Sequence, residues 1–254
     1  MTIEPTAPLG RAEAHVVTYL IYIVLDTSES MRRPQPGTSL GSPVEHFTRL
    51  IPRMLRQLAD HPVSNSLASV SVIAFNDEAE VLRLMSPLHQ PVPIRRPRMG
   101  YGTDYAAVLK FLVEQYPKDV RAEKRRRSNA DYGTAIARPW IFFITDGRPY
   151  AKGADQPPSA WIGYRDQLAD PPVGARIVSL GLAGADETTL WLVATGHENG
   201  VRNAFIADRS TNPLELTTSV VSAIERSIAT SVSTGNLAIR TPAGMLRIEG
   251  TNRG

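Results

Sequence analysis

The stretch YLIYIVLDTSES, residues 19–30, joins an almost continuous apolar run to an aspartate that is followed by two serines on alternate residues. From Thr18 to Leu25 nearly every residue is apolar, and β-branched and aromatic types dominate. Such a run is typical of a strand that is buried on both faces of a parallel sheet. We therefore expect a central strand that ends at Asp26.

Strands and helices alternate along the rest of the chain. Further apolar strands are predicted at 140–145, 175–183 and 203–207, and a hairpin over 67–85 turns at Asn76-Asp77. Helices are predicted at 44–59, 104–116, 159–169, 187–195 and 213–230, and the polar, basic segment 117–138 is predicted as a loop. This alternation indicates a doubly wound α/β fold with a mostly parallel central sheet, one antiparallel edge strand and helices on both faces.

The chain of 254 residues is long enough for one large domain, and no linker divides it. We expect an N-terminal extension over 1–17, the domain over 18–234, and a glycine-containing tail over 235–254 that is flexible or adds a strand. The segment 32–43 is rich in proline and glycine, which predicts an exposed loop directly after the quoted stretch.

Composition excludes several classes of protein. The longest apolar run, 16–25, is too short to cross a bilayer, so no membrane anchor is expected. The chain has no cysteine, which excludes disulfides and thiolate metal sites and suits a reducing cytoplasm. The formal net charge of +3 is too small to imply nucleic acid, and no stacking aromatics accompany the basic runs.

Five oxygen-bearing side chains stand where predicted strands meet loops. Asp26, Ser28 and Ser30 follow the first strand, Asp146 follows the strand 140–145, and Thr103 lies in a loop before a helix. Each alone is also typical of a turn or helix cap. Because ligands of doubly wound sheets bind beyond the carboxyl ends of the strands, we expect the five to converge there. This oxygen set suits Mg²⁺ or, second, Mn²⁺, with room for a carboxylate from a protein partner.

The order of these residues resembles the metal-ion-dependent adhesion site (MIDAS) of von Willebrand factor A (VWA) domains. That pattern has Asp-x-Ser-x-Ser after the first strand, a threonine in a glycine-rich loop, and an aspartate ending a later apolar strand; the similarity extends over about 18–230. Within the family, YLIYIVLDTSESM, GTDYAAVL and FFITDGRP look most like the bacterial tellurium-resistance-associated TerY-type proteins. The resemblance implies a cytoplasmic adaptor in stress signalling, with a protein kinase or PP2C-type phosphatase as its partner.

Two positions depart from the family pattern. Glu29 stands where many relatives have glycine between the serines, and it either enters the site and competes with a partner's carboxylate or faces solvent. Tyr101-Gly102 stands where many have Gly-Gly before the threonine. Asp104, beside Thr103, is expected to cap the following helix or to support the site from outside the ligand set.

Three hypotheses of function follow from these residues. The first is a non-catalytic interaction module that binds an acidic side chain of a protein through its metal ion. The second is a metal-independent adaptor that uses the basic run Lys124, Arg125, Arg126 and Arg127 as a partner contact. The third and least favoured is a Mg²⁺-dependent phosphoryl-transfer enzyme, because the chain lacks an Asp-x-Asp pair, a phosphate-binding Gly-Lys loop and a Gly-x-Ser-x-Gly elbow.

Overall fold

The computed structural model describes residues 15–34, 41–127, 133–196 and 201–249. The strands are β1 (His15–Asp26), β2 (Ala68–Phe75), β3 (Ala79–Pro87), β4 (Gly133–Ile136), β5 (Trp140–Thr145), β6 (Tyr150–Ala151), β7 (Ala154–Asp155), β8 (Arg176–Gly181), β9 (Ala204–Ala207) and β10 (Met245–Arg247). The helices are α1 (Glu29–Arg32), α2 (Pro43–Asp60), α3 (Pro62–Leu67), α4 (Tyr105–Arg127), α5 (Ile162–Ala169), α6 (Glu187–Val193) and α7 (Pro213–Thr234), with one 3₁₀ turn, η1 (Pro158–Ala160).

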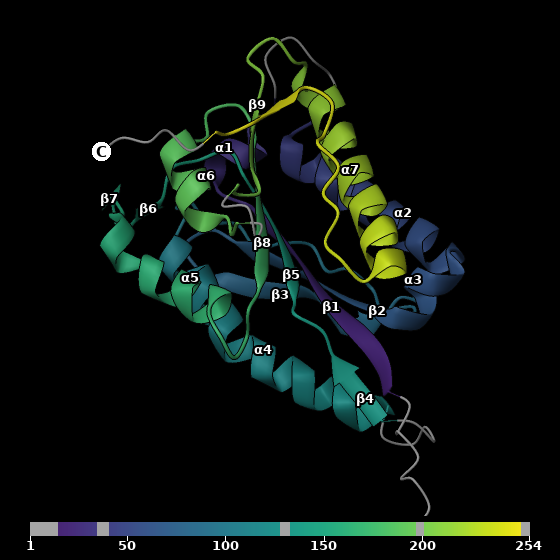
Figure 1. Ribbon diagram of the computed structural model, residues 1–254. Coiled ribbons are helices and arrows are strands. Elements are labelled where there is room, and N and C mark those ends of the chain that lie inside the picture. The colour runs from purple at the N-terminus through teal and green to yellow at the C-terminus, as the bar shows by residue number, and fades with distance from the viewer. Residues whose placement is uncertain (1–14, 35–40, 128–132, 197–200, 250–254) are drawn as a thin grey trace, which may run out of the picture.

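The described strands form an eight-stranded, mostly parallel sheet in the order β10-β9-β8-β5-β1-β2-β3, and β4 pairs with β1 beside this row. Antiparallel strands lie at both edges, since β3 runs against β2 and β10 runs against β9. Helices α2, α3 and α7 lie on one side of the sheet, and α4 and α5 lie on the other (Figure 1). The predicted α/β fold of the VWA/Rossmann-like kind is confirmed, and the tail contributes the second antiparallel edge.

Strand β1 is the centre of this arrangement because its side chains enter two separate hydrophobic cores. Ile21 and Ile23 face the core beneath α2 and α7, whereas Leu20 and Tyr22 face the core beneath α4 and α5. The alternation follows from the two-residue period of a strand. A continuous apolar run is therefore what a strand buried on both faces requires, as the sequence indicated.

Strand order reverses at β1, and this reversal positions the candidate site. From β1 the chain crosses through α2 to the parallel strand β2 on one side, while β5 pairs with β1 on the other. Loops leaving the carboxyl ends of β1 and β5 therefore diverge to opposite faces and leave a crevice between them. Asp26 and Asp146 both lie at this crevice.

The predicted loop at 117–138 is wrong over its first part. Helix α4 continues through Pro117 to Arg127, and the short strand β4 follows. Proline in a helix interior removes one backbone hydrogen bond and so weakens the helix. Side-chain contacts stabilise the turns of α4 that follow Pro117. Asp119 accepts a hydrogen bond of 2.9 Å from the hydroxyl of Tyr22, which ties the helix to the central strand. The polar segment after β5 contains the small hairpin β6-β7.

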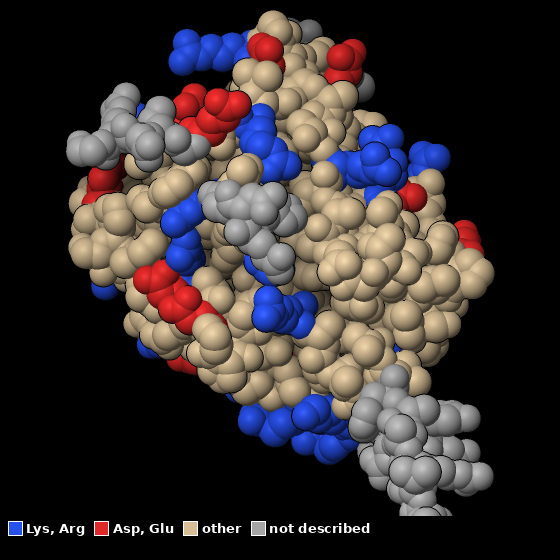
Figure 2. Space-filling model, in the orientation of Figure 1, with Lys and Arg blue, Asp and Glu red and all other residues tan. Residues whose placement is uncertain are grey.

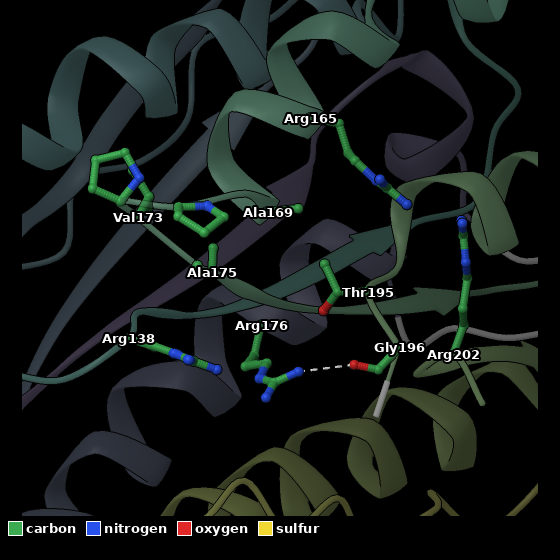
Figure 3. A pocket seen from close by; sticks show the side chains of 12 residues that line it. Arg138, Arg165, Ala169, Val173, Ala175, Arg176, Thr195, Gly196 and Arg202 are labelled. Atoms are coloured by element: carbon green, nitrogen blue, oxygen red, sulfur yellow. Dashed lines mark hydrogen bonds between the residues drawn. The ribbon is translucent and has the colours of Figure 1, made fainter. Parts of the chain in front are cut away.

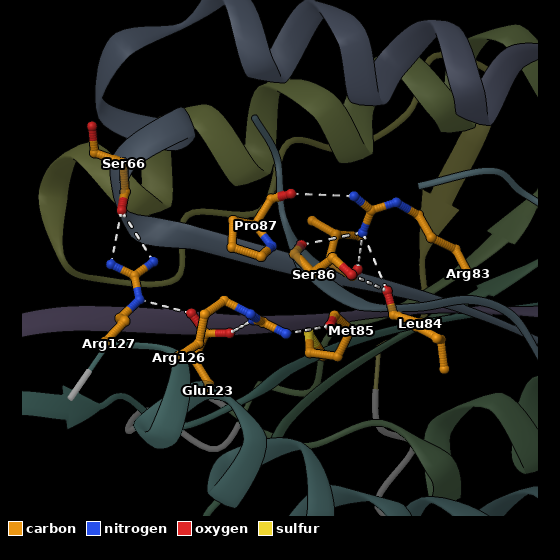
Figure 4. Close-up of polar contacts among 10 residues, drawn as sticks. Ser66, Arg83, Leu84, Met85, Ser86, Pro87, Glu123, Arg126 and Arg127 are labelled. Atoms are coloured by element: carbon orange, nitrogen blue, oxygen red, sulfur yellow. Dashed lines mark hydrogen bonds and ion pairs between the residues drawn. The ribbon is translucent and has the colours of Figure 1, made fainter. Parts of the chain in front are cut away.

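The last turn of α4 is held by a buried glutamate (Figure 4). Glu123 is fully buried and accepts from the guanidinium groups of Arg126 and, at 2.7 Å, Arg127. Arg126 also donates to the carbonyl of Met85, and Arg127 donates to the carbonyl of Ser66. Arg126 and Arg127, two of the four residues proposed as a partner contact, therefore bond within the protein, although Lys124, Arg125 and Arg126 are all exposed.

Parts of four predicted segments lie outside the described residues, one of them being 128–132 of the predicted loop 117–138. The others are 1–14 of the N-terminal extension, 35–40 of the loop 32–43, and 250–254 of the tail. Strand β1 begins at His15, three residues before the expected start.

Charges of both signs are interspersed on the visible face of the protein. Figure 2 shows Lys and Arg side chains in several separate groups, one of them along the lower edge over α4, with Asp and Glu between them. In the described part of the chain, no helix is both long enough and apolar enough to span a membrane.

Replacing Glu123 with alanine should lower the free energy of unfolding by about 3 kcal/mol, because it leaves two partly buried guanidinium groups without their carboxylate. Glu114→Ala is the matched control on the same helix. Its contact with Lys110 spans 4.0 Å between half-exposed side chains, so its effect should stay within about 0.5 kcal/mol. Urea unfolding of both variants measures the difference, and equal effects would contradict a structural role for Glu123.

Candidate metal centre

Asp26 is the buried anchor of the site. Its side chain is fully enclosed at the end of β1, where one carboxylate oxygen accepts the backbone N–H of Ser28 at 2.8 Å. The other oxygen accepts the hydroxyl of Thr145 at 2.6 Å. Donors from two chain segments thus fix the orientation of this carboxylate.

Two serines connect Asp26 to the second carboxylate. The hydroxyls of Ser28 and Ser30 lie 3.2 Å apart, and Ser30 donates to Asp146 at 2.8 Å. Ser28 is buried, whereas Ser30 is exposed and Asp146 is partly exposed. The row of oxygens therefore runs from the interior of the sheet edge to its surface.

Thr103 reaches the same point from the loop before α4. Its backbone N–H and carbonyl pair with Tyr150 at 2.7 and 3.1 Å, which joins this loop to the segment after β5. A Cβ placed on Gly147 would lie 3.3 Å from the Thr103 hydroxyl and 3.9 Å from the Asp26 carboxylate. The hydroxyl and the carboxylate thus flank the backbone of Gly147, and all five predicted ligands are brought together.

The loop that carries Thr103 is held by Asp77, which the sequence assigned only to a hairpin turn. Its carboxylate accepts the backbone N–H groups of Tyr101 and Gly102 at 2.7 and 2.8 Å. A Cβ at Gly102 would lie 2.4 Å from this carboxylate and 2.9 Å from the carbonyl of Tyr150. Glycine is therefore required at 102, while position 101 accepts a tyrosine whose side chain is exposed.

The electrostatics of the site favour a bound cation. Burial, with the nearby charge of Asp146, raises the pKa of Asp26 to about 7, although hydrogen bonds from Thr145 and Ser28 act in the opposite direction. Burial also raises the pKa of Asp146 to about 6, against the hydrogen bond from Ser30 and the charge of Arg33. Two neighbouring carboxylates are thus costly to ionise together unless a positive charge joins them.

The donor set fits a small hard cation. Two carboxylates balance a divalent charge, three hydroxyls are neutral oxygen ligands, and such sets suit Mg²⁺ or Mn²⁺, which keep coordination positions for water or another anion. Within the described ranges, no three His, Cys, Asp or Glu side chains are grouped as a metal site. The hydroxyls are therefore essential members of this candidate centre.

The two flanking residues differ in their roles. Glu29 forms an exposed ion pair of 2.9 Å with Arg33, one helical turn later. Asp104 accepts the backbone N–H of Ala107 at 2.8 Å and the side-chain amide of Gln156 at 2.9 Å. The carboxylate of Glu29 is thus engaged by Arg33 in this structure, and Asp104 acts as the cap of α4.

Sequence reasoning missed two residues that build the site, Thr145 and Asp77. Thr145 precedes Asp146 in FFITDG, and the signal was its place as the last residue of an apolar strand, where its hydroxyl meets Asp26. Asp77 gave no such signal, because Asn-Asp after a strand is typical of a turn. Its contact with residues 101 and 102 depends on tertiary structure.

Comparison with known proteins supports the fold. Neither a protein-family model nor a curated protein matches the sequence. Among solved structures, proximal thread matrix protein 1 (PTMP1) from the mussel byssus, with a zinc-occupied MIDAS motif, is 16% identical with a TM-score of 0.51, covering 86% of this chain and 49% of that one. The D319A mutant of the PilB minor pilin from Streptococcus sanguinis is 13% identical, with a TM-score of 0.54 and coverage of 91% and 65%.

A third similar structure is the pilus adhesin SpaC from Lactobacillus rhamnosus GG, at 12% identity and a TM-score of 0.57, covering 87% of this chain and 31% of SpaC. The chain therefore spans about half of PTMP1 and less than a third of SpaC. At these identities the likeness establishes a common fold, and the site must be argued from the residues of this chain.

Metal-free protein should lose stability as pH rises from about 4 to about 7. Because the folded state holds protons on Asp26 and Asp146 more tightly than the unfolded chain does, the unfolded state loses protons first and gains in relative stability. Because one unit of pKa shift corresponds to about 1.4 kcal/mol, we expect a fall on the order of 5 kcal/mol from this pair. Urea unfolding in chelator measures it, and Asp26→Asn should flatten the profile; an unchanged profile would contradict the raised pKa.

Proposed function

We propose that this protein is a non-catalytic interaction module that binds an acidic side chain of a protein partner through a divalent metal ion. The observation that carries the proposal is the convergence of two carboxylates and three hydroxyls from separate loops at the edge between β1 and β5. The zinc-occupied MIDAS motif of PTMP1 supports it, since that protein shares the fold.

The surface around the site suits a protein rather than a small ion alone. Three large side chains beside the site are exposed: Met99 by 83%, Tyr101 by 79% and Tyr150 by 43%. Tyr101 and Tyr150 flank Thr103, one through the sequence and the other through backbone pairing. Aromatic residues and methionine are enriched where proteins contact each other, so a partner's carboxylate would meet the ion while its apolar groups cover this rim.

The burial and hydrogen bonds of Asp26 support a non-catalytic role. Its carboxylate is fully buried, and both oxygens accept hydrogen bonds, so it is poorly placed to attack a phosphoryl group. Metal-dependent hydrolysis of a generic phosphoester by the wild type, abolished in Asp26→Asn, would overturn this part of the proposal and favour the phosphoryl-transfer alternative.

The metal and the biological setting are more specific parts of the proposal. Oxygen ligands support Mg²⁺ first and Mn²⁺ second. The resemblance of three motifs to TerY-type proteins supports a cytoplasmic adaptor in stress or tellurium-resistance-type signalling, with a protein kinase or a PP2C-type phosphatase as the partner. The competing, metal-independent adaptor would use the basic run Lys124, Arg125, Arg126 and Arg127, of which the first three are exposed.

Calorimetric titration of Mg²⁺ and Mn²⁺ into metal-stripped protein should show binding that releases protons near pH 6.5, because the metal displaces protons from the two carboxylates. Asp26→Ala should abolish this binding, with circular dichroism confirming that the variant is folded. Asp60→Ala, which removes an exposed aspartate at the end of α2, should bind as the wild type does. Equal binding by Asp26→Ala and the wild type would place the ion elsewhere.

Tyr101→Ala should weaken partner binding about tenfold or more while leaving Mg²⁺ binding unchanged, since it removes apolar contact beside the ion but no ligand. The measurement is surface plasmon resonance against a protein kinase or a PP2C-type phosphatase from the same organism, the partner class proposed above, with and without Mg²⁺. Leu84→Ala on β3, whose side chain is 64% exposed, is the control. Partner binding that is unchanged by a chelator but lost when Lys124 and Arg125 are neutralised would favour the metal-independent adaptor.

A further inference from the structure

A pocket of about 400 Å³ lies at the amino edge of the sheet, opposite the candidate metal centre. Arg138 precedes β5, Arg176 begins β8, and Arg202 precedes β9, while Arg165 projects from α5. Figure 3 shows these arginines around the hollow, with Arg138 and Arg176 on one side and Arg165 and Arg202 on the other. Four segments that are distant in sequence therefore bring their positive charges to one place.

These charges are incompletely balanced in the described part of the chain. The described lining of the pocket contains no carboxylate. Asp166 pairs with Arg165 at 2.6 Å from outside that lining. Arg138 forms no hydrogen bond or ion pair with any described residue. One carboxylate thus faces a group of four guanidinium ions.

Three of the guanidinium groups are held in position before any ligand arrives. Arg202 stacks on the ring of Trp191 at 3.7 Å and donates to the carbonyl of the same residue at 2.7 Å. Arg176 donates to the carbonyl of Gly196 at 3.0 Å (Figure 3). Arg165 donates to the carbonyl of Ala194 at 3.1 Å. Because these carbonyls carry no charge, they orient the arginines without neutralising them.

Arg165 and Arg202 show that the pocket holds an unpaired hydrogen-bond donor and two cations that repel each other. The Nε–H of Arg165 is enclosed and has no hydrogen-bond partner among the described residues, and buried donors are rarely left so. Burial and the charge of Arg165 lower the pKa of Arg202, which means that the two cations repel each other. A bound anion would offset this repulsion.

We propose that this arginine pocket binds a phosphoryl group, either free phosphate or the phosphate of a small phosphorylated molecule. A planar carboxylate is satisfied by one guanidinium, whereas a dianion with several oxygens can accept from arginines on opposite sides at once. The volume lies within the range of small-ligand sites. The pocket is separate from the metal centre, so this function does not depend on the metal-dependent one.

The test is calorimetric titration of inorganic phosphate, pyrophosphate and glycerol 3-phosphate into the full chain, with succinate as the carboxylate probe. Chelator is present throughout, so that no anion binds through a metal ion. The double variant Arg138→Gln/Arg176→Gln removes two of the pocket's charges and leaves the stacked Arg202 and its neighbour Arg165 in place. Arg121→Gln, on the exposed face of α4, is the single-charge control, and Arg121→Gln/Arg125→Gln matches the double variant in charge.

The phosphate probes should bind, and the double pocket variant should weaken them about tenfold or more, as expected for lost charge-assisted hydrogen bonds. Binding should be retained in both α4 controls. Preference for glycerol 3-phosphate over phosphate would identify an organic phosphate as the ligand, and the reverse would identify the free ion. No binding to wild type at millimolar concentration, equal loss in the α4 controls, or tighter binding of succinate would each overturn the proposal. Unchanged Mg²⁺ titration and circular dichroism confirm that the pocket variant remains folded.

Discussion

The parallel pairing of β1 with β5 is the constraint on which the candidate metal centre depends. Leu25 lies opposite Ile144, so the next residues on each strand, Asp26 and Thr145, meet at the sheet edge. The hydroxyl of Thr145 then donates to Asp26, and Asp146 follows at once. A shift of one residue in this register would turn the aspartate to the other face of the sheet and leave its carboxylate without these donors.

Elsewhere the fold buries charge only where it supplies close partners. The guanidinium of Arg83 is buried between β2 and β3 and donates to several backbone carbonyls, among them those of Ser86 and Pro87 (Figure 4). Burial lowers its pKa to about 10, which leaves it charged at neutral pH. The buried carboxylate of Glu123 is likewise paired, because it accepts hydrogen bonds from Arg126 and Arg127. Against this background, the pair Asp26 and Asp146 differs, since its hydrogen-bond donors are hydroxyls and backbone N–H groups and neither carboxylate forms an ion pair with a described residue.

The sequence predicted what depends on local pattern. Continuous apolar runs predicted β1 and β5. Polar residues directly after these runs predicted candidate ligands, because a parallel sheet brings the ends of its strands to one edge. The end of α4 was missed since Pro117 and the polar residues after it are typical of a loop, and only tertiary contacts reveal that Asp119 and Glu123 are buried. The arginine pocket was missed for the same reason, as Arg138, Arg165, Arg176 and Arg202 belong to no motif.

The two candidate sites lie at opposite edges of one sheet and are joined by β5, with Arg138 just before this strand and Asp146 just after it. At roughly 3.3 Å per residue, eight residues of extended chain separate them by more than about 20 Å. This exceeds the screening length of about 8 Å at physiological ionic strength, so charge at one edge is only weakly felt at the other. Strand β5 is buried on both faces and paired on both sides, which resists a sliding motion. A cation at one edge and a phosphate at the other should therefore bind independently.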